Sequence, residues 1–204
     1  MAKTMNSRNI SAARKMTTTA IMAAIAVILQ YVEFPVPIMP GFIKLDFSDL
    51  PALLSSFALG PWYGALVELL KNLIHLPATQ SMGVGELSNF ILGALFVIPA
   101  GFIYQRNRSR KNALIGSVVG AVLMAGLSFV TNYFVVYPVY MNFMPEEAIV
   151  AAYHAILPSV TSLAQALVIF NIPFTFVKGM LDVVLTFIIY KHVSPIILGV
   201  HNEK

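Results

Sequence analysis

Six apolar segments, separated by short polar stretches, organise this chain. They lie at about 17–33, 50–60, 62–76, 85–105, 112–140 and 172–190. A membrane-spanning helix needs roughly 20 mainly apolar residues, so most of these segments are long enough to cross a bilayer. Residues 50–60 are too few to span comfortably and are expected to tilt or pack inside. The pattern predicts an all-α integral membrane protein, a compact bundle of six helices forming one domain over residues 1–204.

The stretch from Leu50 to Leu76 could form one long helix or two helices broken at Gly60–Pro61. Basic residues decide between these alternatives, because Lys and Arg concentrate on the cytoplasmic side of membrane proteins. With six spans, the loop 106–111 and the C-terminal tail lie on the same side as the basic N-terminus. With five, that loop and the tail lie on opposite sides. We therefore expect six spans in a cell membrane, with both termini cytoplasmic.

The composition supports a membrane protein and excludes several other classes. Hydrophobic residues make up 58% of the chain and charged residues 11%, and the mean hydropathy is +0.78. The net charge of +4 does not indicate nucleic-acid binding, since ten of the thirteen basic residues fall in three extramembrane stretches. These are Lys3, Arg8, Arg14, Lys15, Arg106, Arg108, Arg110, Lys111, Lys191 and Lys204. The absence of cysteine excludes disulfides, thiolate metal sites and thiol catalysis.

Two polar segments have patterns of their own. Between Pro35 and Asp49, apolar and polar residues alternate from Ile43 to Phe47, which predicts an extended, half-buried piece. Farther along, residues 146–157 are typical of a short amphipathic helix outside the membrane. Residues 158–170 are apolar enough to lie against the bilayer or to extend the fifth or sixth helix.

Lys178 and Asp182 stand four residues apart in the last apolar segment. Burying an unpaired charge in a bilayer costs roughly 2.5–3.5 kcal/mol on insertion scales, so intramembrane charges usually have a function. The spacing puts both on one helical face, where each can offset the other's desolvation. A structural ion pair and a polar ligand or ion site are both open interpretations.

Further polar residues fall toward the outer side of the predicted topology and indicate an outward-facing polar pocket. It would suit an uncharged or weakly polar ligand with several hydrogen-bonding groups. Glu68 and Lys71 share a face, as a bracing ion pair or as ligand contacts, and backbone amides of the turn at Gly83–Glu86 could approach a ligand. The remaining candidates are Lys44, Asp46, Asp49, Asn72, His75, Asn89, Asn132, Tyr133 and Thr175, with Phe42, Phe47, Phe90 and Tyr137 as possible stacking partners.

No catalytic or metal-binding motif accompanies this pocket. A phosphate-binding loop, a Ser-His-acid pattern and histidines at metal-ligand spacing are all missing from the sequence. Any transport must therefore draw on an ion gradient or on a partner. Ala20 and Ala24 form a small-residue face on the first helix that permits close helix approach, within this chain or against another protein.

Several motifs, in order along the chain, resemble one membrane protein family. They are Phe42-Ile43-Lys44-Leu45-Asp46-Phe47-Ser48-Asp49-Leu50-Pro51, Leu59-Gly60-Pro61, Lys71-Asn72-Leu73, Gly83-Val84-Gly85-Glu86-Leu87-Ser88-Asn89-Phe90, Asn132-Tyr133 and Pro173-Phe174-Thr175-Phe176-Val177-Lys178-Gly179. The set is similar to the substrate-binding S components of energy-coupling factor (ECF) vitamin transporters, most of all to the riboflavin-specific type.

The resemblance implies a six-helix membrane protein that captures riboflavin from outside, beneath a mobile first loop that caps the ligand. Riboflavin would be a transported ligand and not a cofactor. The implied partners are a transmembrane coupling protein and two ABC-type ATPases, with Ala20 and Ala24 facing the coupling protein. By position, Asn132 and Lys178 match flavin-contacting residues, Thr175 stands where the family commonly has asparagine, and Leu45 and Gly85 fall in loops that close over the ligand. Asp182 and Glu68 complete the candidate binding residues.

Three alternatives remain at this stage. The first is an S component for another vitamin. The second is a stand-alone secondary transporter that couples uptake to protons through Lys178 and Asp182. The third is a small membrane enzyme with Glu68, His75 or Asp182 as acid or base, against which the lack of a clustered catalytic motif counts.

Overall fold

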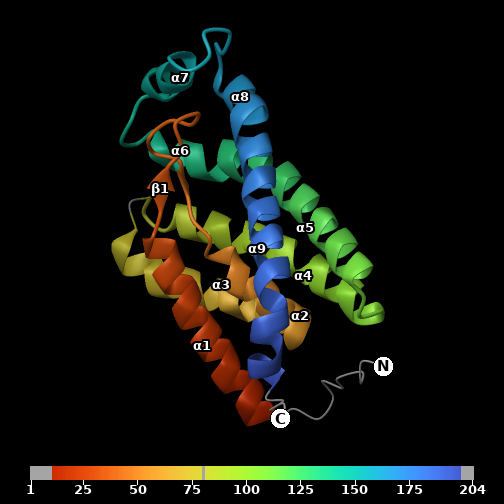
Figure 1. Ribbon diagram of the computed structural model, residues 1–204. Coiled ribbons are helices and arrows are strands. Elements are labelled where there is room, and N and C mark those ends of the chain that lie inside the picture. Colours follow the sequence, from red (N-terminus) through yellow and green to blue (C-terminus); the bar gives the residue numbers. More distant parts are fainter. Residues whose placement is uncertain (1–10, 80, 199–204) are drawn as a thin grey trace.

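The computed structural model describes residues 11–79 and 81–198, which form a bundle made mainly of helices (Figure 1). In chain order the elements are α1 (Ala12–Tyr31), β1 (Phe34–Pro35), β2 (Lys44–Leu45), α2 (Asp49–Ala58), α3 (Pro61–His75), η2 (Leu76–Ala78), α4 (Val84–Arg106), α5 (Arg110–Thr131), η3 (Asn132–Val136), α6 (Tyr137–Tyr140), α7 (Glu146–His154), α8 (Leu163–Ala166), η4 (Leu167–Asn171) and α9 (Ile172–Leu198). Lys3, Arg8 and Lys204, which contributed to the predicted orientation, lie outside the described residues.

Local sequence signals account for several helix boundaries. Ser11 and Ser109 stand just before α1 and α5, and their hydroxyl groups accept hydrogen bonds from the backbone N–H groups of Arg14 and Asn112. Such caps satisfy amides that have no partner within the helix. Between α2 and α3, Gly60 adopts φ +131°, a conformation that favours glycine, and Pro61 begins α3. Of the two alternatives for residues 50–76, the structure therefore adopts two helices separated at Gly60–Pro61.

The helices differ in length in a way that matters for the membrane. In the part of the chain that the structure describes, four helical stretches are long and apolar enough to cross a bilayer: Ala12–Tyr31, Val84–Arg106, Arg110–Tyr140 and Leu163–Val193. The last of these starts upstream of the predicted boundary at 172, so residues 163–170 extend the final helix. By contrast, α2 has 10 residues, all of them buried. It is about 15 Å long, roughly half the hydrocarbon thickness, and packs inside the bundle.

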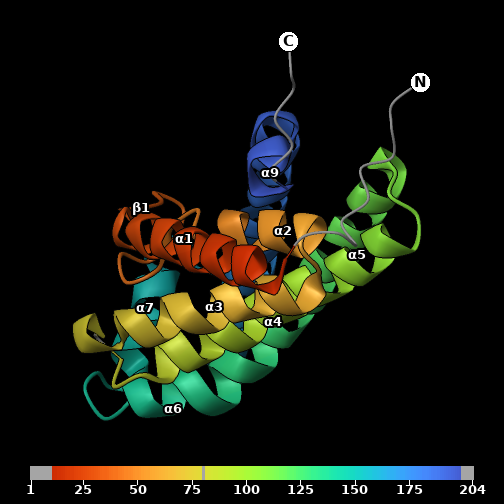
Figure 2. The same ribbon diagram turned by 90° about the horizontal axis from the view of Figure 1, so that it is seen from below.

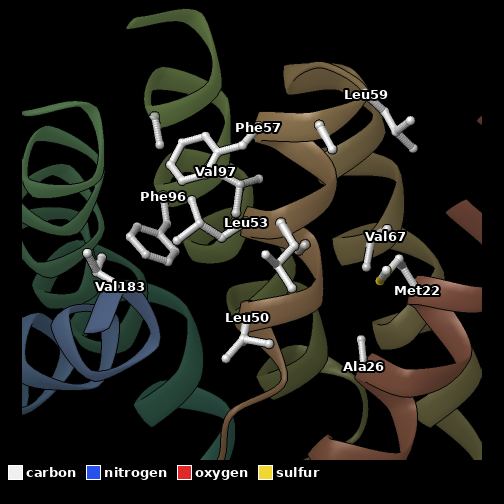
Figure 3. Close-up of a cluster of buried hydrophobic side chains, with 14 of the residues drawn as sticks. Met22, Ala26, Leu50, Leu53, Phe57, Leu59, Val67, Phe96, Val97 and Val183 are labelled. Carbon is white, nitrogen blue, oxygen red and sulfur yellow. The ribbon is translucent and has the colours of Figure 1, made fainter. Parts of the chain in front are cut away.

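A central apolar cluster joins α1, α2, α3, α4, α5 and α9 (Figure 3). Leu53 and Phe57 of α2 face Phe96 and Val97 of α4, and Val183 of α9 closes the far side. Close helix approach completes this packing. A Cβ atom on Gly116 of α5 would lie only 2.8 Å from the backbone oxygen of Ala100, so α4 and α5 pack nearly backbone to backbone there.

The first loop, α7 and α8 lie together at the upper end of the molecule in Figure 1, away from the first turns of α1. In the loop, β1 and β2 pair antiparallel, with Phe34 opposite Leu45. Above them in Figure 1, a second apolar cluster packs α7 against α8 and η4. The predicted alternation is wrong at Asp46, which is 8% exposed and as buried as Leu45. Its carboxylate turns inward because a lysine on α9 binds it.

Two π-helical turns interrupt the long helices, η3 after α5 and η4 before α9. Each ends two residues before a proline, Pro138 and Pro173 respectively. Proline has no N–H group to close the usual hydrogen bond, and its ring clashes with the preceding turn, so the helix widens locally. Asn132 begins the first π turn and Asn171 ends the second. Figure 2 shows the bundle from below, with α9 crossing beside α2 and α5.

Candidate functional site

A polar cavity of about 270 Å³ lies beneath the first loop, between α4, the η3 end of the fifth helix and the η4–α9 segment. Aromatic rings and hydrogen-bonding side chains share its wall. The lining residues are Phe42, Ile43, Lys44, Asp46, Asp49, Gly85, Ser88, Asn89, Leu92, Met124, Asn132, Val136, Tyr137, Tyr140, Asn171, Phe174, Thr175 and Lys178. Pockets for small molecules combine apolar walls with placed polar groups, and this cavity has both, with a larger polar share than is typical.

Asn132 presents a hydrogen-bond acceptor to the cavity. Its Nδ2 donates to the backbone oxygen of Ser128 at 2.8 Å, one turn back on α5. The amide oxygen Oδ1 is then left for another donor. The π turn that begins at Asn132 brings its side chain to the cavity wall.

Lys178 ties α9 to the first loop. Its Nζ lies 2.9 Å from Asp46 Oδ2 and 3.5 Å from Asp49 Oδ2, and its side chain is 12% exposed. Burial would raise the pKa of Asp46, but the ammonium groups of Lys178 and Lys71, together with a hydrogen bond from Ser48, outweigh burial, and the pKa is lowered from its ordinary value. The backbone N–H of Ser48 also donates to Asp46 at 2.8 Å. The loop is thus held down by an ionised carboxylate.

The expected pairing of Lys178 with Asp182 is not formed. Lys178 extends instead toward Asp46, 132 residues earlier in the sequence. Asp182 lies one turn deeper in α9, is 0% exposed and does not line the cavity. Neither of its oxygens has a hydrogen-bond partner among the described residues. Asp46 of the first loop and Asp49 at the start of α2 are the partners of this ammonium group in place of Asp182.

A second buried lysine organises the region beneath the loop. Lys71 Nζ donates to Ser48 Oγ at 2.8 Å, forms an ion pair with Asp49, and lies 2.8 Å from Glu68 Oε2. Lys71 and Glu68 are both 0% exposed, and neither lines the cavity. The Glu68 carboxylate lies against Gly93 of α4, where a Cβ atom would collide with it. The structure therefore places Glu68 in an ion pair with Lys71 within α3, packed against α4 and away from the cavity.

The other candidate residues divide between the cavity and its surroundings. Thr175 and Gly85 line the cavity, whereas Leu45, which belongs to β2, is buried and does not. Of the possible stacking partners, Phe42 and Tyr137 line it, while Phe47, Phe90 and Tyr133 do not.

The turn before α4 does not leave its amides for a ligand. The N–H groups of Gly83 and Gly85 donate to Thr79 Oγ1 and Ser81 Oγ at 3.0 and 2.9 Å. Glu86 accepts from Thr79 Oγ1 at 2.7 Å and lies 3.0 Å from His75. These contacts brace the wall of an adjoining cavity of about 300 Å³, which shares Phe42, Lys44, Gly85, Asn89 and Tyr140 with the first.

Asn171 and its partner Tyr153 are among the residues at the site that sequence reasoning missed. Asn171 lines the cavity, and Tyr153 of α7 donates a hydrogen bond to its Oδ1 at 2.7 Å. Both lie in the segment whose boundaries the apolar pattern left open. The signal that could have found Asn171 is its place two residues before Pro173, which disturbs the helix there. Within 11–79 and 81–198, no group of three or more His, Cys, Asp or Glu side chains could hold a metal ion.

A comparison with known protein families places this fold. The model of the substrate-specific component of ECF transporters matches residues 14–190. The chain belongs to this family. The S component, as we now call it, is 31% identical to the riboflavin transporter RibU of Staphylococcus aureus (strain TCH60), over 91% of this chain and 93% of that protein. It is 30% identical to the riboflavin transporter FmnP of Bacillus subtilis (strain 168), over 89% and 93%.

Solved structures show the same architecture. The S component of a bacterial ECF transporter superposes with a TM-score of 0.72 at 29% identity, covering 91% of this chain and 98% of that one. ThiT from Listeria monocytogenes superposes with a TM-score of 0.60 at 15% identity, covering 90% and 96%, which shows a shared fold alone. Membership in a family of bacterial membrane transporters agrees with the apolar helices of this S component and makes it a transport subunit, not an enzyme.

Proposed function

We propose that this S component binds riboflavin from the outside and delivers it to an ATP-driven ECF importer. The observation that carries the proposal is the identity of 31% and 30% to two proteins named riboflavin transporters, each across about nine-tenths of the chain. The stretch that matches the family model, residues 14–190, contains all the residues that line the cavity.

The chemistry of the cavity fits a flavin. Phe42, Tyr137 and Tyr140 offer aromatic surface for a planar tricyclic ring. Asn132 offers an acceptor, and Lys178 and Thr175 offer donors to ring carbonyls or ribityl hydroxyl groups. A buried cavity of this kind favours a ligand that satisfies each of these groups, since stranding one of them is costly.

The first loop acts as the cap in this proposal. It is tied to α9 by the Lys178–Asp46 ion pair and to the end of α1 by the pair of Lys44 with Glu33. Phe42 and Lys44 stand between the two adjoining cavities, so their displacement would join them into one space. Pockets for drug-sized ligands measure about 300–1,000 Å³, which the joined space would reach.

The membrane arrangement and the partners belong to the same proposal. The short helices α2 and α3 would complete a six-helix unit with both termini cytoplasmic. A transmembrane coupling protein would contact α1 at Ala20 and Ala24, which are exposed, whereas the neighbouring Ala23 is buried in the core. Two ABC-type ATPases would supply the energy, because the sequence holds no phosphate-binding loop of its own.

Titration of the purified S component in detergent, followed by quenching of flavin fluorescence, tests the ligand. Saturable riboflavin binding is expected, with no competition from thiamine. Asn132→Ala should weaken it by about 1–3 kcal/mol, the usual cost of stranding a buried polar group. Absence of riboflavin binding, or preference for thiamine, would refute the proposed ligand.

Uptake into vesicles tests the partners. Replacing Ala20 and Ala24 with leucine should leave riboflavin binding unchanged and abolish ATP-dependent uptake by the assembled complex. Exposed Ile21 on the same helix, changed to leucine, provides the matched control. Loss of binding in the double variant would show that this face packs internally. Uptake without any ATPase that collapses with the proton gradient would support the secondary-transporter alternative instead.

A further inference from the structure

Asn171 stands at the cavity wall, fixed by an aromatic hydrogen-bond chain that comes from outside the bundle. The residue is 7% exposed and ends the π turn η4. Tyr153, on the extramembrane helix α7, donates its hydroxyl hydrogen to Asn171 Oδ1 at 2.7 Å. Tyr137, which also lines the cavity, lies 2.7 Å from the same hydroxyl, oxygen to oxygen.

The directions of these hydrogen bonds follow from counting hydrogens. Tyr153 has a single O–H group, and Asn171 receives it. The contact between Tyr137 and Tyr153 must then use the Tyr137 hydroxyl as donor. Both tyrosines are almost fully buried, at 4% and 0% exposure, so no water replaces either bond. The chain therefore runs one way, from Tyr137 through Tyr153 to the amide oxygen of Asn171.

This arrangement leaves the nitrogen of the Asn171 amide available. With Oδ1 engaged by Tyr153, the two N–H groups of Nδ2 are the remaining polar function of the side chain. Asn171 also lies close to the Tyr137 hydroxyl, but no described residue forms a hydrogen bond of normal geometry with Nδ2, and the side chain lines the cavity. A locked rotamer with free donors at a cavity wall is an arrangement prepared for an acceptor on a ligand.

Asn171 also complements the two nearest polar residues of the site. Asn132, across the cavity on η3, has its nitrogen engaged and its oxygen free, the reverse arrangement. Thr175 lies one turn beyond Asn171 on the same helical face and contributes a single hydroxyl donor. Asn171 therefore adds amide donors that the other two residues do not supply.

We propose that Asn171 contacts the transported ligand, with its Nδ2 donating to a carbonyl or hydroxyl oxygen, and that Tyr153 is a positioning residue that fixes the amide. The inference rests on the proposed riboflavin-binding function and adds a contact to it. It also gives α7, which packs outside the bundle, a part in ligand affinity through Tyr153.

Riboflavin titration of the purified full chain and its variants tests this inference. Asn171→Ala should weaken binding about tenfold or more, and so should Asn171→Asp, which keeps the size but has no N–H. Tyr153→Phe should weaken binding about threefold to tenfold in the wild-type background and add nothing in the Asn171→Ala background. Tyr133→Phe, at a tyrosine that is 38% exposed and lines no part of this cavity, should bind as the wild type does.

The outcomes separate the inference from the function on which it rests. Wild-type affinity in Asn171→Ala would overturn the contact, while riboflavin binding by the wild type would still uphold the function. Additive losses from Tyr153→Phe and Asn171→Ala would overturn the positioning role. If Tyr153→Phe does not yield folded protein by gel filtration, Tyr137→Phe takes its place in the cycle, with the same non-additive result expected. A wild-type chain that does not bind riboflavin would refute both.

Discussion

Lys71 and Lys178 are both buried lysines bound by carboxylates, yet they stand in different surroundings. Lys71 is 0% exposed and is surrounded by Asp49, Glu68 and Ser48. Lys178 keeps 12% of its side chain exposed, at the wall of the cavity, and its main partner belongs to the first loop. Asp49 lies between the two and contacts both. One region holds helices together, whereas the other holds a loop over a cavity.

The difference shows that burial of a charge does not by itself identify a binding residue. What matters is whether the charged group is fully enclosed by its partners or retains access to open space. In a bilayer both arrangements overcome the same desolvation penalty. Only a charged group with access to open space, such as Lys178, can exchange a protein partner for a ligand. Four measurements test this difference between the two lysines.

The largest effect is expected at Lys71. Lys71→Met would leave Asp49 and Glu68 in the interior without their cation, so the free energy of unfolding should fall by about 3–5 kcal/mol. Thermal unfolding in detergent measures this change. Arg106→Met, at a basic residue near the end of α4, serves as a control and should unfold like the wild type. A stability equal to that of the wild type would show that Lys71 does not brace the bundle.

Asp49→Asn should affect both regions, because this carboxylate contacts both lysines. Losing a charge-assisted hydrogen bond costs about 1.5–3 kcal/mol, so unfolding and riboflavin binding should both weaken by amounts of that order. The two quantities are measured on one preparation, by thermal unfolding and by fluorescence titration. A change in only one of them would mean that the two lysine regions are energetically separate.

Lys178→Met should act mainly on binding. Riboflavin affinity should fall by about 1–3 kcal/mol, since a cavity donor is lost. Stability should change less than in Lys71→Met, because Asp46 lies in the loop and can turn toward water once released. Titration and thermal unfolding of the two methionine variants side by side give the comparison. Equal losses of stability would place both lysines in the same structural role.

The smallest effect is expected from pH, because the stability of the closed first loop should not change between pH 8 and 5. The pKa of Asp46 is lowered from its ordinary 3.8, so its stabilising contribution is complete above that value and is lost only as the pH falls through the folded-state pKa. Between pH 8 and 5 the opening free energy of the loop, measured by amide hydrogen exchange of residues 42–47, should stay constant. A steady decrease across this range would contradict an ionised Asp46 bound to Lys178.

The sequence identified the polar residues of the site more readily than the partners that they bind. Lys178, Asn132 and Thr175 stood out because polar groups are rare in apolar helices, and all three line the cavity. The partner of Lys178 could not be found by spacing. A residue four positions away is always near on a helix, whereas Asp46 is brought close only by the way the first loop folds back.

The helix pattern had a comparable limit. Apolar content located the long helices, and the glycine and proline at 60 and 61 marked the end of α2. Asn171 escaped notice because a lone asparagine at the edge of an apolar run is also typical of a loop. Its place in the site depends on the π turn and on Tyr153, and the latter contact joins elements that no periodic pattern connects.

The short, fully enclosed helix α2 has a consequence for how the protein is made. Its ten residues include Asp49, Ser55 and Ser56, so it is a poor substrate for insertion on its own. It must enter the bilayer as a hairpin with α3, so α2 placed alone between two soluble reporter domains should fail to insert into membranes, whereas the α2–α3 segment should insert. Membrane insertion of this protein therefore depends on α2 and α3 entering together, and helices that follow in the chain separate α2 from the lipid.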